Sequence, residues 1–354
     1  MSRRWRKLFP WTRNRSADVP PPEPEQTPVA LDDPEYREFM EGGASAPPID
    51  QLFAQRLRLR LRAMLAPRYW KAGLATGFDV TGLNRAGVLM QRHLLWPWAR
   101  ALNYHDVPAA HAPAFEEQLR FFARHFVNVG PAELAELHAG RWHHPKPGLL
   151  LTFDDGLRCH ADVVAPLLEK YGFTGWFTVP VGFVETPPAE QRAFAEAHQI
   201  SCDASDLADE RIAMSWNDLR RLDVHHEICC HTWNHRRLSS EVGEADLDVE
   251  IDQAKRALED GLGHEVRGFA WVGGEEWSYS REAADRIRAA GFGFSFMTNN
   301  AVIRPHAELL QVHRTNVEAH FDPALMRLCL SGFYDVLYLP KRRRVNRLTA
   351  ARAA

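Results

Sequence analysis

Leu149-Leu150-Leu151-Thr152-Phe153-Asp154-Asp155-Gly156 is a short apolar run that ends in two adjacent carboxylates and a glycine. The run is too short for a helix and meets a turn signal at once, so it predicts a buried strand. Two acids at the end of a buried strand are costly unless something binds them. In α/β sheets and barrels, catalytic groups lie at this end of a strand. Adjacent strand residues point to opposite faces, so Asp154 and Asp155 need not share a role.

A pair of histidines follows further along the chain. The segment His231-Thr232-Trp233-Asn234-His235 places two imidazoles four residues apart. That spacing brings both rings to one side of a helical turn or a tight loop, as a metal site requires. Two histidines and one carboxylate, with the remaining positions open to water, are typical of a catalytic rather than a structural divalent-metal site.

Together the two motifs resemble those of the polysaccharide deacetylase family, the NodB-homology carbohydrate esterases. That family carries Thr-Phe-Asp-Asp-Gly and then His-Ser/Thr-x-x-His, which here are residues 152–156 and 231–235. The resemblance covers roughly residues 102–318. It implies an α/β fold, a distorted (β/α) barrel of the NodB-homology type with fewer than the usual eight units.

The resemblance also implies a role for each residue of these motifs. Asp155, His231 and His235 would bind the metal, which in the family is most often zinc. Asp154 would be the general base for the attacking water, and the adjacent cation should favour its ionised state. The ligand set favours Zn²⁺, although Co²⁺, Ni²⁺ or Mn²⁺ could occupy the same His/His/Asp site.

The general acid is expected from the family's last motif, a histidine at the end of a late strand. Residues 309–313, Leu-Leu-Gln-Val-His, are the best match, which makes His313 the candidate that protonates the leaving amine. The other interpretation is a strand-end histidine without that role, and His320 is the second candidate. His105 ends a strand-like segment, and it either lines the site or is a structural histidine.

The third motif departs from the family pattern. Residues 269–274, Phe-Ala-Trp-Val-Gly-Gly, stand where relatives have Arg-Pro-Pro-Tyr-Gly or Phe-Ala-Tyr-Pro-Phe-Gly. Ala270 fills the arginine position, so no arginine there tunes Asp154. Gly273 replaces the aromatic residue whose backbone N–H helps to hold the oxyanion. Its own N–H can still donate, from a loop that we expect to be looser.

Aromatic and acidic side chains surround this motif. Trp233, Trp271 and Trp277 are candidates for stacking on sugar, although core packing is the commoner use of tryptophan. Glu275 and Glu276 follow the two glycines and either bind an amine-bearing substrate or are solvated.

Strand and helix patterns alternate along the rest of the chain, which predicts a parallel sheet or barrel. An insertion or lid is expected at 185–214, because this segment is polar and contains adjacent prolines. The predicted strands are 174–180, 227–230, 267–272 and 293–297, and the predicted helices are 115–126, 160–171, 247–261 and 281–290.

The composition is that of a globular protein with basic ends. The chain has 354 residues, 45% of them hydrophobic, and a net charge of -3. Residues 1–15 and 341–354 each hold six Arg or Lys and no acid, so the body is acidic and does not resemble a nucleic-acid binder. Five cysteines without metal-ligand spacing argue against a disulfide framework and favour a reducing compartment.

Four parts are expected along the chain. They are a disordered basic, Pro-rich tail and linker at 1–50, a basic amphipathic segment at 51–76, the catalytic domain at 77–340, and a basic C-terminal tail at 341–354. Neither a secretory signal peptide nor a transmembrane helix is predicted. The segment 51–76 either packs on the catalytic domain or makes a peripheral membrane contact. We therefore expect a cytoplasmic protein, in the second case on the inner face of the membrane.

These observations predict a metal-dependent N-deacetylase that acts on an N-acylated amino sugar of a cell-envelope polysaccharide or its precursor. The predicted partner is a carbohydrate substrate, and no obligate protein partner is evident. One alternative is a hydrolase of the same fold that acts on a small non-sugar amide. The other is a catalytically silent glycan-binding protein, which the altered third motif favours and the intact Asp and His residues disfavour.

Overall fold

The computed structural model describes residues 67–202 and 211–351. Residues 66–354 form one compact unit. The segments predicted as a disordered tail and linker, and most of the predicted amphipathic segment, lie outside the described residues. Among the described helices, none has the length and apolar character needed to cross a bilayer.

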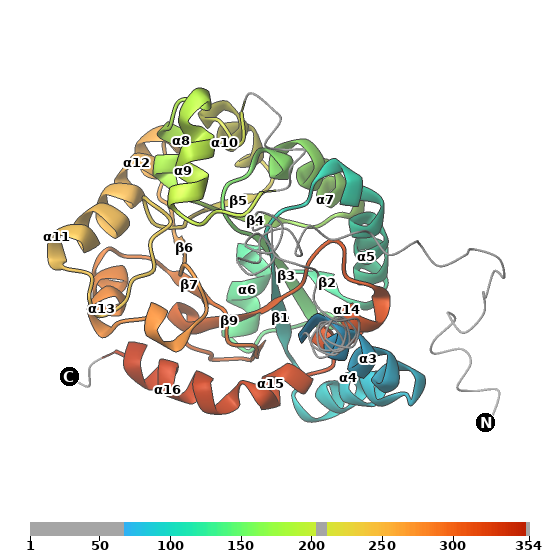
Figure 1. The fold of residues 1–354 in the computed structure, drawn as a ribbon. Helices are drawn as coiled ribbons and strands as arrows, with labels where there is room; N and C mark the ends of the chain where they lie inside the picture. Colours follow the sequence, from blue (N-terminus) through green and yellow to red (C-terminus); the bar gives the residue numbers. More distant parts are fainter. Residues whose placement is uncertain (1–66, 203–210, 352–354) are drawn as a thin grey trace, which may run out of the picture. The chain divides into compact units, whose positions relative to one another are not determined.

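A parallel barrel forms the centre of this unit (Figure 1). Within the described residues, seven parallel strands pair in the order β1-β3-β4-β5-β6-β7-β9, and β9 pairs with β1 to close the ring. The short β2 extends β3, and β8 runs antiparallel to β1. The predicted distorted barrel with fewer than eight units is therefore confirmed. The strands are β1 Ala99–Tyr104, β2 Val127–Asn128, β3 Gly148–Phe153, β4 Gly175–Val179, β5 Glu227–Cys230, β6 Gly268–Ala270, β7 Phe294–Met297, β8 Val302–Ile303 and β9 Val312–Asn316.

Helices surround the barrel, and the four that the sequence predicted lie near their expected positions. Gly172 and Gly263, both with left-handed backbone, end two of them, and Ser215 caps a third by accepting from the Asp218 N–H. The helices are α3 Pro67–Val80, α4 Leu83–Leu94, α5 Ala112–His125, α6 Pro131–His138, α7 Ala165–Tyr171, α8 Val181–Glu185, α9 Gln191–Ala197, α10 Trp216–Leu222, α11 Glu244–Leu247, α12 Ala254–Leu262, α13 Arg281–Ala289, α14 Pro323–Leu330, α15 Phe333–Leu337 and α16 Leu339–Thr349.

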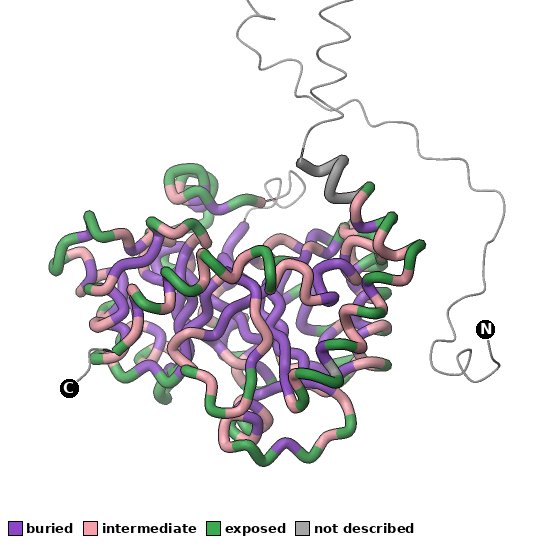
Figure 2. The backbone as a smooth tube through the Cα atoms, turned by 90° about the horizontal axis from the view of Figure 1, so that it is seen from below, coloured by how far each residue is buried: buried purple, intermediate pink, exposed green. Residues whose placement is uncertain are grey.

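The side chains on the two faces of the strands pack into two separate hydrophobic cores. On β3, Leu149, Leu151 and Phe153 pack outward with α5 residues such as Phe115, in the layer between barrel and helices. Leu150 belongs instead to the core inside the barrel. Figure 2 shows buried residues concentrated in the central strands, with exposed residues on the surrounding segments. Because successive side chains along a strand alternate between these two cores, their position in the strand decides which of them reach the interior of the barrel.

Two helices run across the predicted domain boundaries. Helix α3 runs through residue 77, where the catalytic domain was expected to begin, and its Asp79 forms a bidentate ion pair with Arg327 of α14 (2.7 and 2.7 Å). The expected basic C-terminal tail is mostly the helix α16. It packs on the barrel because Val345 and Thr349 are buried and its basic side chains reach acids and carbonyl oxygens.

Candidate active site

A cavity of about 870 Å³ lies at the carboxyl ends of the barrel strands. Most of its lining comes from residues at or after the ends of β1, β3, β5, β6, β7 and β9, and the rest comes from the segment after α9 and from Tyr338 and Lys341. The side chains predicted from the two motifs meet there: Asp154, Asp155, His231 and His235 all line the cavity, together with His105. This is the end of a parallel barrel at which the chain can vary its loops without disturbing the core.

The backbone that presents the metal-ligand candidates is locally strained. Asp155, Thr232 and His235 have φ values of 80°, 66° and 51°, in the left-handed region that non-glycine residues seldom occupy. Hydrogen bonds hold this conformation: the buried Glu250 accepts from the N–H groups of Trp233 (3.0 Å) and Asn234 (2.8 Å). Such strain persists only where the surroundings fix it, and it is concentrated at functional sites.

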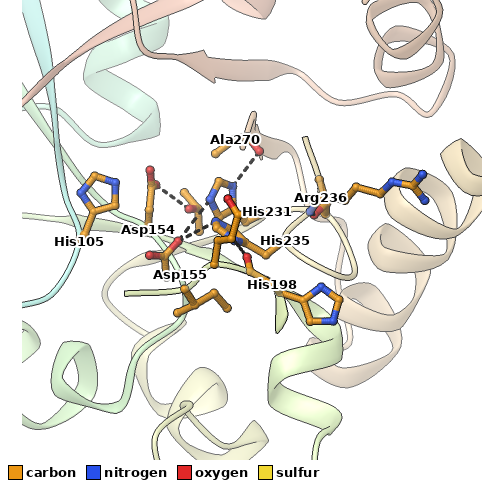
Figure 3. Close-up of polar contacts among 12 residues, drawn as sticks. His105, Asp154, Asp155, His198, His231, His235, Arg236 and Ala270 are labelled. Atoms are coloured by element: carbon orange, nitrogen blue, oxygen red, sulfur yellow. Dashed lines mark hydrogen bonds and ion pairs between the residues drawn. The ribbon is translucent and has the colours of Figure 1, made fainter. Parts of the chain in front are cut away.

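Asp155, His231 and His235 form a compact cluster. The Nε2 atoms of His231 and His235 lie 3.6 and 3.1 Å from Oδ1 of Asp155, and one ligand atom from each residue lies within 4.8 Å of the others. Each ring is oriented by its other nitrogen, since Nδ1 of His231 is 2.9 Å from the Ala270 carbonyl oxygen and Nδ1 of His235 is 2.7 Å from that of His198 (Figure 3). A carbonyl oxygen only accepts, so each Nδ1 carries a proton and each neutral ring presents the Nε2 lone pair to the cluster.

This donor set fits a divalent cation. Oδ1 of Asp155 is buried and accepts no well-formed hydrogen bond from the described residues. A buried carboxylate oxygen that faces two nitrogen lone pairs is unfavourable without a positive charge between them. Two imidazoles and one carboxylate leave further coordination positions open, as in catalytic metal sites.

Asp154 accepts four hydrogen bonds from three side chains, one of which is an arginine that the sequence analysis did not find. Arg314 of β9 donates to both carboxylate oxygens (2.5 and 2.8 Å), Thr178 donates to Oδ1 (2.7 Å), and Asn103 donates to Oδ2 (3.1 Å). Burial alone would raise the pKa of Asp154, but the charge and the hydrogen bonds of Arg314 outweigh it and hold the pKa well below its usual range. Asp154 is therefore ionised at neutral pH and fixed in orientation.

The arginine expected to be missing at position 270 thus comes from another strand. Arg314 itself is almost fully buried, and its guanidinium also lies over the ring of Phe296 inside the barrel (5.9 Å). A signal for Arg314 was present in the sequence. The side-chain alternation applied to Asp154 and Asp155 also predicts that one of two adjacent polar residues on β9 points inward.

His105 lines the cavity, as one of its two interpretations predicted. Its Nδ1 lies 3.0 Å from Oε1 of Glu318, which follows β9. Burial alone would lower the pKa of His105, but the hydrogen bond to Glu318 and the charges of Asp155, Glu318 and Asp154 raise it to about 9. Figure 3 shows His105 on one side of the two aspartates and the two cluster histidines on the other. The ring is therefore a protonated group beside the cluster.

The structure does not bring His313 or Trp271 into the cavity. His313 precedes Arg314 on β9, so its side chain points to the opposite face, where Nε2 lies 2.7 Å from Oδ1 of Asn346 on α16. Burial lowers its pKa to about 4, so His313 is neutral at pH 7. Trp271 is likewise on the outward face, where its Nε1 donates to Ser295 (3.1 Å) and its ring packs on Phe269 and Tyr279. His320, the second candidate for the acid, does line the cavity.

The loop after β6 is pinned, although two glycines predicted a looser loop. Lys341 of α16 donates to the Gly274 carbonyl oxygen, and Arg344 pairs with Glu276. Gly273 lines the cavity with φ of 80°, a left-handed conformation that favours glycine. A Cβ there would come within 2.7 Å of Glu275 Oε2, the end of a flexible side chain that could shift. Glu275 also lines the cavity, whereas Glu276 is half exposed in its ion pair. The helix α16 thus fixes the rim of the cavity.

Comparison with protein families matches residues 143–294 to the polysaccharide deacetylase model. Among curated proteins, the poly-beta-1,6-N-acetyl-D-glucosamine N-deacetylase of Escherichia coli (strain K12) is 25% identical over 176 residues, which are 45% of this chain and 25% of that protein. The protein of the same description from Escherichia coli O157:H7 matches to the same extent. The chain therefore spans about a quarter of the length of the curated relatives that it matches.

Solved structures share the barrel. The deacetylase PplD of Streptococcus pyogenes, in complex with acetate, has a TM-score of 0.52 and 16% identity, over 66% of this chain and 97% of that one. IcaB from Ammonifex degensii has a TM-score of 0.52 and 21% identity, over 67% of this chain and 97% of that one. At these identities the matches establish the fold.

Proposed function

We propose that the protein is a metal-dependent N-deacetylase of an amino-sugar polysaccharide, because residues 143–294 match the polysaccharide deacetylase model. This proposal is carried by one observation: a single cavity is lined by the Asp155, His231 and His235 cluster, by the ionised Asp154 and by the protonated His105. An amide hydrolase needs these three functions: activation of water, a proton acceptor and a proton donor for the leaving amine.

Asp155, His231 and His235 are the residues that would hold the metal. A divalent cation there would supply Lewis-acid polarisation of the acyl carbonyl and a lowered pKa for water. Two nitrogen donors and one oxygen donor suit zinc, and Co²⁺, Ni²⁺ and Mn²⁺ are the other candidates.

Asp154 is proposed as the general base. Its carboxylate lines the cavity beside the metal cluster and stays ionised through the charge of Arg314. Of its four hydrogen bonds, the one from the amide of Asn103, at 3.1 Å, is the longest, and Asn103 also lines the cavity. A water molecule that enters the cavity beside Asn103 can therefore reach Oδ2 of Asp154. Thr178 and Arg314 keep the carboxylate in place while it accepts the proton.

His105 replaces His313 as the proposed general acid. A group that donates a proton to a leaving amine must be protonated before the step and must face the substrate. His105 meets both conditions through Glu318 and its place in the cavity lining, and His313 meets neither. Gly273 keeps its predicted role as a backbone donor to the oxyanion, because it lines the same cavity.

The substitution Glu318→Gln tests this assignment through pH dependence. It keeps a hydrogen-bonding side chain but removes the charge that raises the pKa of His105. The protonated imidazole is then lost at a lower pH, so the basic limb of the kcat/KM profile should move to lower pH by about 1–3 units. The control is Glu265→Gln, at an exposed position. An unmoved basic limb in Glu318→Gln would remove His105 as the acid.

Acetate release tests the proposed function itself. Purified protein loaded with zinc should release acetate from N-acetylglucosamine oligomers. The small-amide alternative is tested with simple N-acetyl amines, which should be poor substrates. Hydrolysis of those amines at the same kcat/KM as the sugars would favour the alternative.

The membrane contact and the cytoplasmic location stay predictions, because the basic segments at 1–15 and 51–66 lie outside the described residues. Helix α4, which follows α3 in the chain, favours the contact, since its Leu83, Met90 and Leu94 are exposed while Asn84 and Gln91 are buried. Co-sedimentation with anionic phospholipid vesicles tests this idea. Equal binding by the full chain and by a chain that begins at Gly77 would remove the N-terminal segments from it.

A further inference from the structure

Trp277 is an exposed aromatic residue beside the active-site cavity. Its side chain is 61% exposed, whereas Trp98, Trp176 and Trp271 are fully buried. It lies in the short helical turn that follows the third motif, immediately after two residues of the pinned rim, Glu275 and Glu276. A single exposed apolar side chain is ordinary on a protein surface, so the inference rests on the cavity that Trp277 lines and not on its exposure alone.

Trp277 is held in a fixed position. Glu276 forms a bidentate pair with Arg344 (2.8 and 3.0 Å to Nε, 2.8 Å to Nη2), and the buried Ser278 donates to the Glu275 carbonyl oxygen (2.7 Å). The guanidinium of Arg237 lies 5.6 Å from the ring centroid. These contacts fix the backbone on both sides of Trp277 and support one face of the ring. The exposed indole is therefore a preformed platform.

A second cavity, of about 540 Å³, has Trp277 in its wall. It adjoins the active-site cavity, because Gln199, His235 and Arg237 line both. Nη1 of Arg237 donates to Oε1 of Gln199 (2.9 Å), so this pair forms the divide between the two cavities. A ligand long enough to fill both would pass directly beside a residue of the metal cluster.

The lining of the second cavity suits a neutral, hydroxyl-rich ring. Besides Trp277 it offers the side chains of Gln199 and Asn234, whose amide is oriented by Glu250 (2.9 Å). Its cations are already paired, Arg236 with Asp246 (3.0 Å) and Arg237 with Glu275 (3.4 Å). In Figure 3 the Arg236 side chain points away from the metal cluster. An aromatic wall with amide groups and neutralised cations fits a sugar ring better than a phosphate.

We propose that the second cavity is a sugar-binding subsite, the Trp277 subsite, which holds a neighbouring sugar unit while the reacting unit lies in the active-site cavity. This inference rests on the proposed function and deepens it. The substrate is then an oligosaccharide or polysaccharide rather than a single amino sugar. Trp277 determines that preference by stacking on the neighbouring ring, and it takes no part in the chemical step.

The test compares Trp277→Ala with wild type on the N-acetylglucosamine monomer and on its β-1,6-linked pentamer, with acetate release as the readout. The kcat/KM for the pentamer should fall about five- to tenfold, as expected for the loss of one aromatic stacking contact, and that for the monomer should stay unchanged. Trp277→Phe should retain part of the preference for the pentamer. Trp96→Ala, at a residue 39% exposed in the turn between α4 and β1, is the matched control and should change neither value.

A binding measurement distinguishes the failure of this inference from the failure of the proposed function. Isothermal titration of the full chain with the pentamer should give a Kd about five- to tenfold higher in Trp277→Ala. If wild type binds the pentamer in this way but releases acetate from none of the sugars, the proposed function fails and the subsite stands. Equal Kd values, or an equal loss of kcat/KM on monomer and pentamer, would overturn the subsite.

Discussion

Asp154→Asn is expected to lower kcat by about 10²–10⁴-fold, the range that general acid–base groups contribute. The asparagine keeps the size of the side chain and can still meet Thr178 and Asn103, but it cannot accept a proton from water. Asp155, His231 and His235 are unchanged, so the metal content should stay at the wild-type level. The measurement is steady-state acetate release, with elemental analysis of the same sample.

Asp162→Asn is the matched control for this substitution. Asp162 lies in an exposed pair with Arg158, four residues away (2.9 Å), where the loss of charge should change kcat and stability little. If Asp154→Asn retained wild-type kcat with full metal content, Asp154 would not be the base, and the water would need another proton acceptor.

Arg314→Met is expected to destabilise the protein by about 3–5 kcal/mol, because it leaves the buried carboxylate of Asp154 without its ion pair. Activity should fall as well, since the pKa of Asp154 loses its main lowering influence and rises. The free energy of unfolding is measured by chemical denaturation. Arg120→Met, at an exposed pair with Glu116 (3.6 Å), is the control and should leave the free energy of unfolding almost unchanged.

A double variant separates structure from catalysis at this pair. Asp154→Asn combined with Arg314→Met removes both charges, so its stability should exceed that of Arg314→Met alone, while its activity stays as low as that of Asp154→Asn. A double variant no more stable than Arg314→Met would show that the loss comes from the packing of the arginine on Phe296 rather than from the unpaired carboxylate.

The metal cluster was predictable from the sequence because its residues lie in two short local motifs. His231 and His235 are four residues apart, so their spacing predicted that they lie together, and the family resemblance joined them to Asp155. The parallel sheet or barrel followed from the alternation of strand and helix patterns, and Leu149 to Phe153 lie in β3 as expected. Each of these local patterns spans only a few adjacent residues.

The choice of His313 as the acid and the omission of Arg314 have the same cause, because both depend on contacts between residues far apart in the sequence. His313 was chosen for its position near a strand end, but β9 continues to Asn316, and the inward positions of that strand are those of Arg314 and Asn316. Arg314 meets Asp154 across 160 residues, a distance over which motif spacing carries no information. Strand alternation, applied to β9, would have separated His313 from Arg314.

The C-terminal helix shows a further limit of composition. Residues 341–354 contain six basic side chains and no acid, which is typical of a solvated tail. Their partners are the Gly274 carbonyl oxygen, Glu276 and the carbonyl oxygens of Asn299 and Asn300, all distant in sequence. A run of basic residues that looks like a solvated tail can therefore be a packed helix, in which Glu276 pairs with Arg344 and carbonyl oxygens accept from Lys341 and Arg342.

The most direct test of a metal-dependent active site is the divalent metal content of purified protein, in wild type and in His231→Ala/His235→Ala, by elemental analysis after gentle dialysis. The account predicts about one equivalent per chain in wild type and almost none in the variant. Metal absent from both, even after zinc is added, would contradict it and would favour a glycan-binding protein without hydrolytic activity.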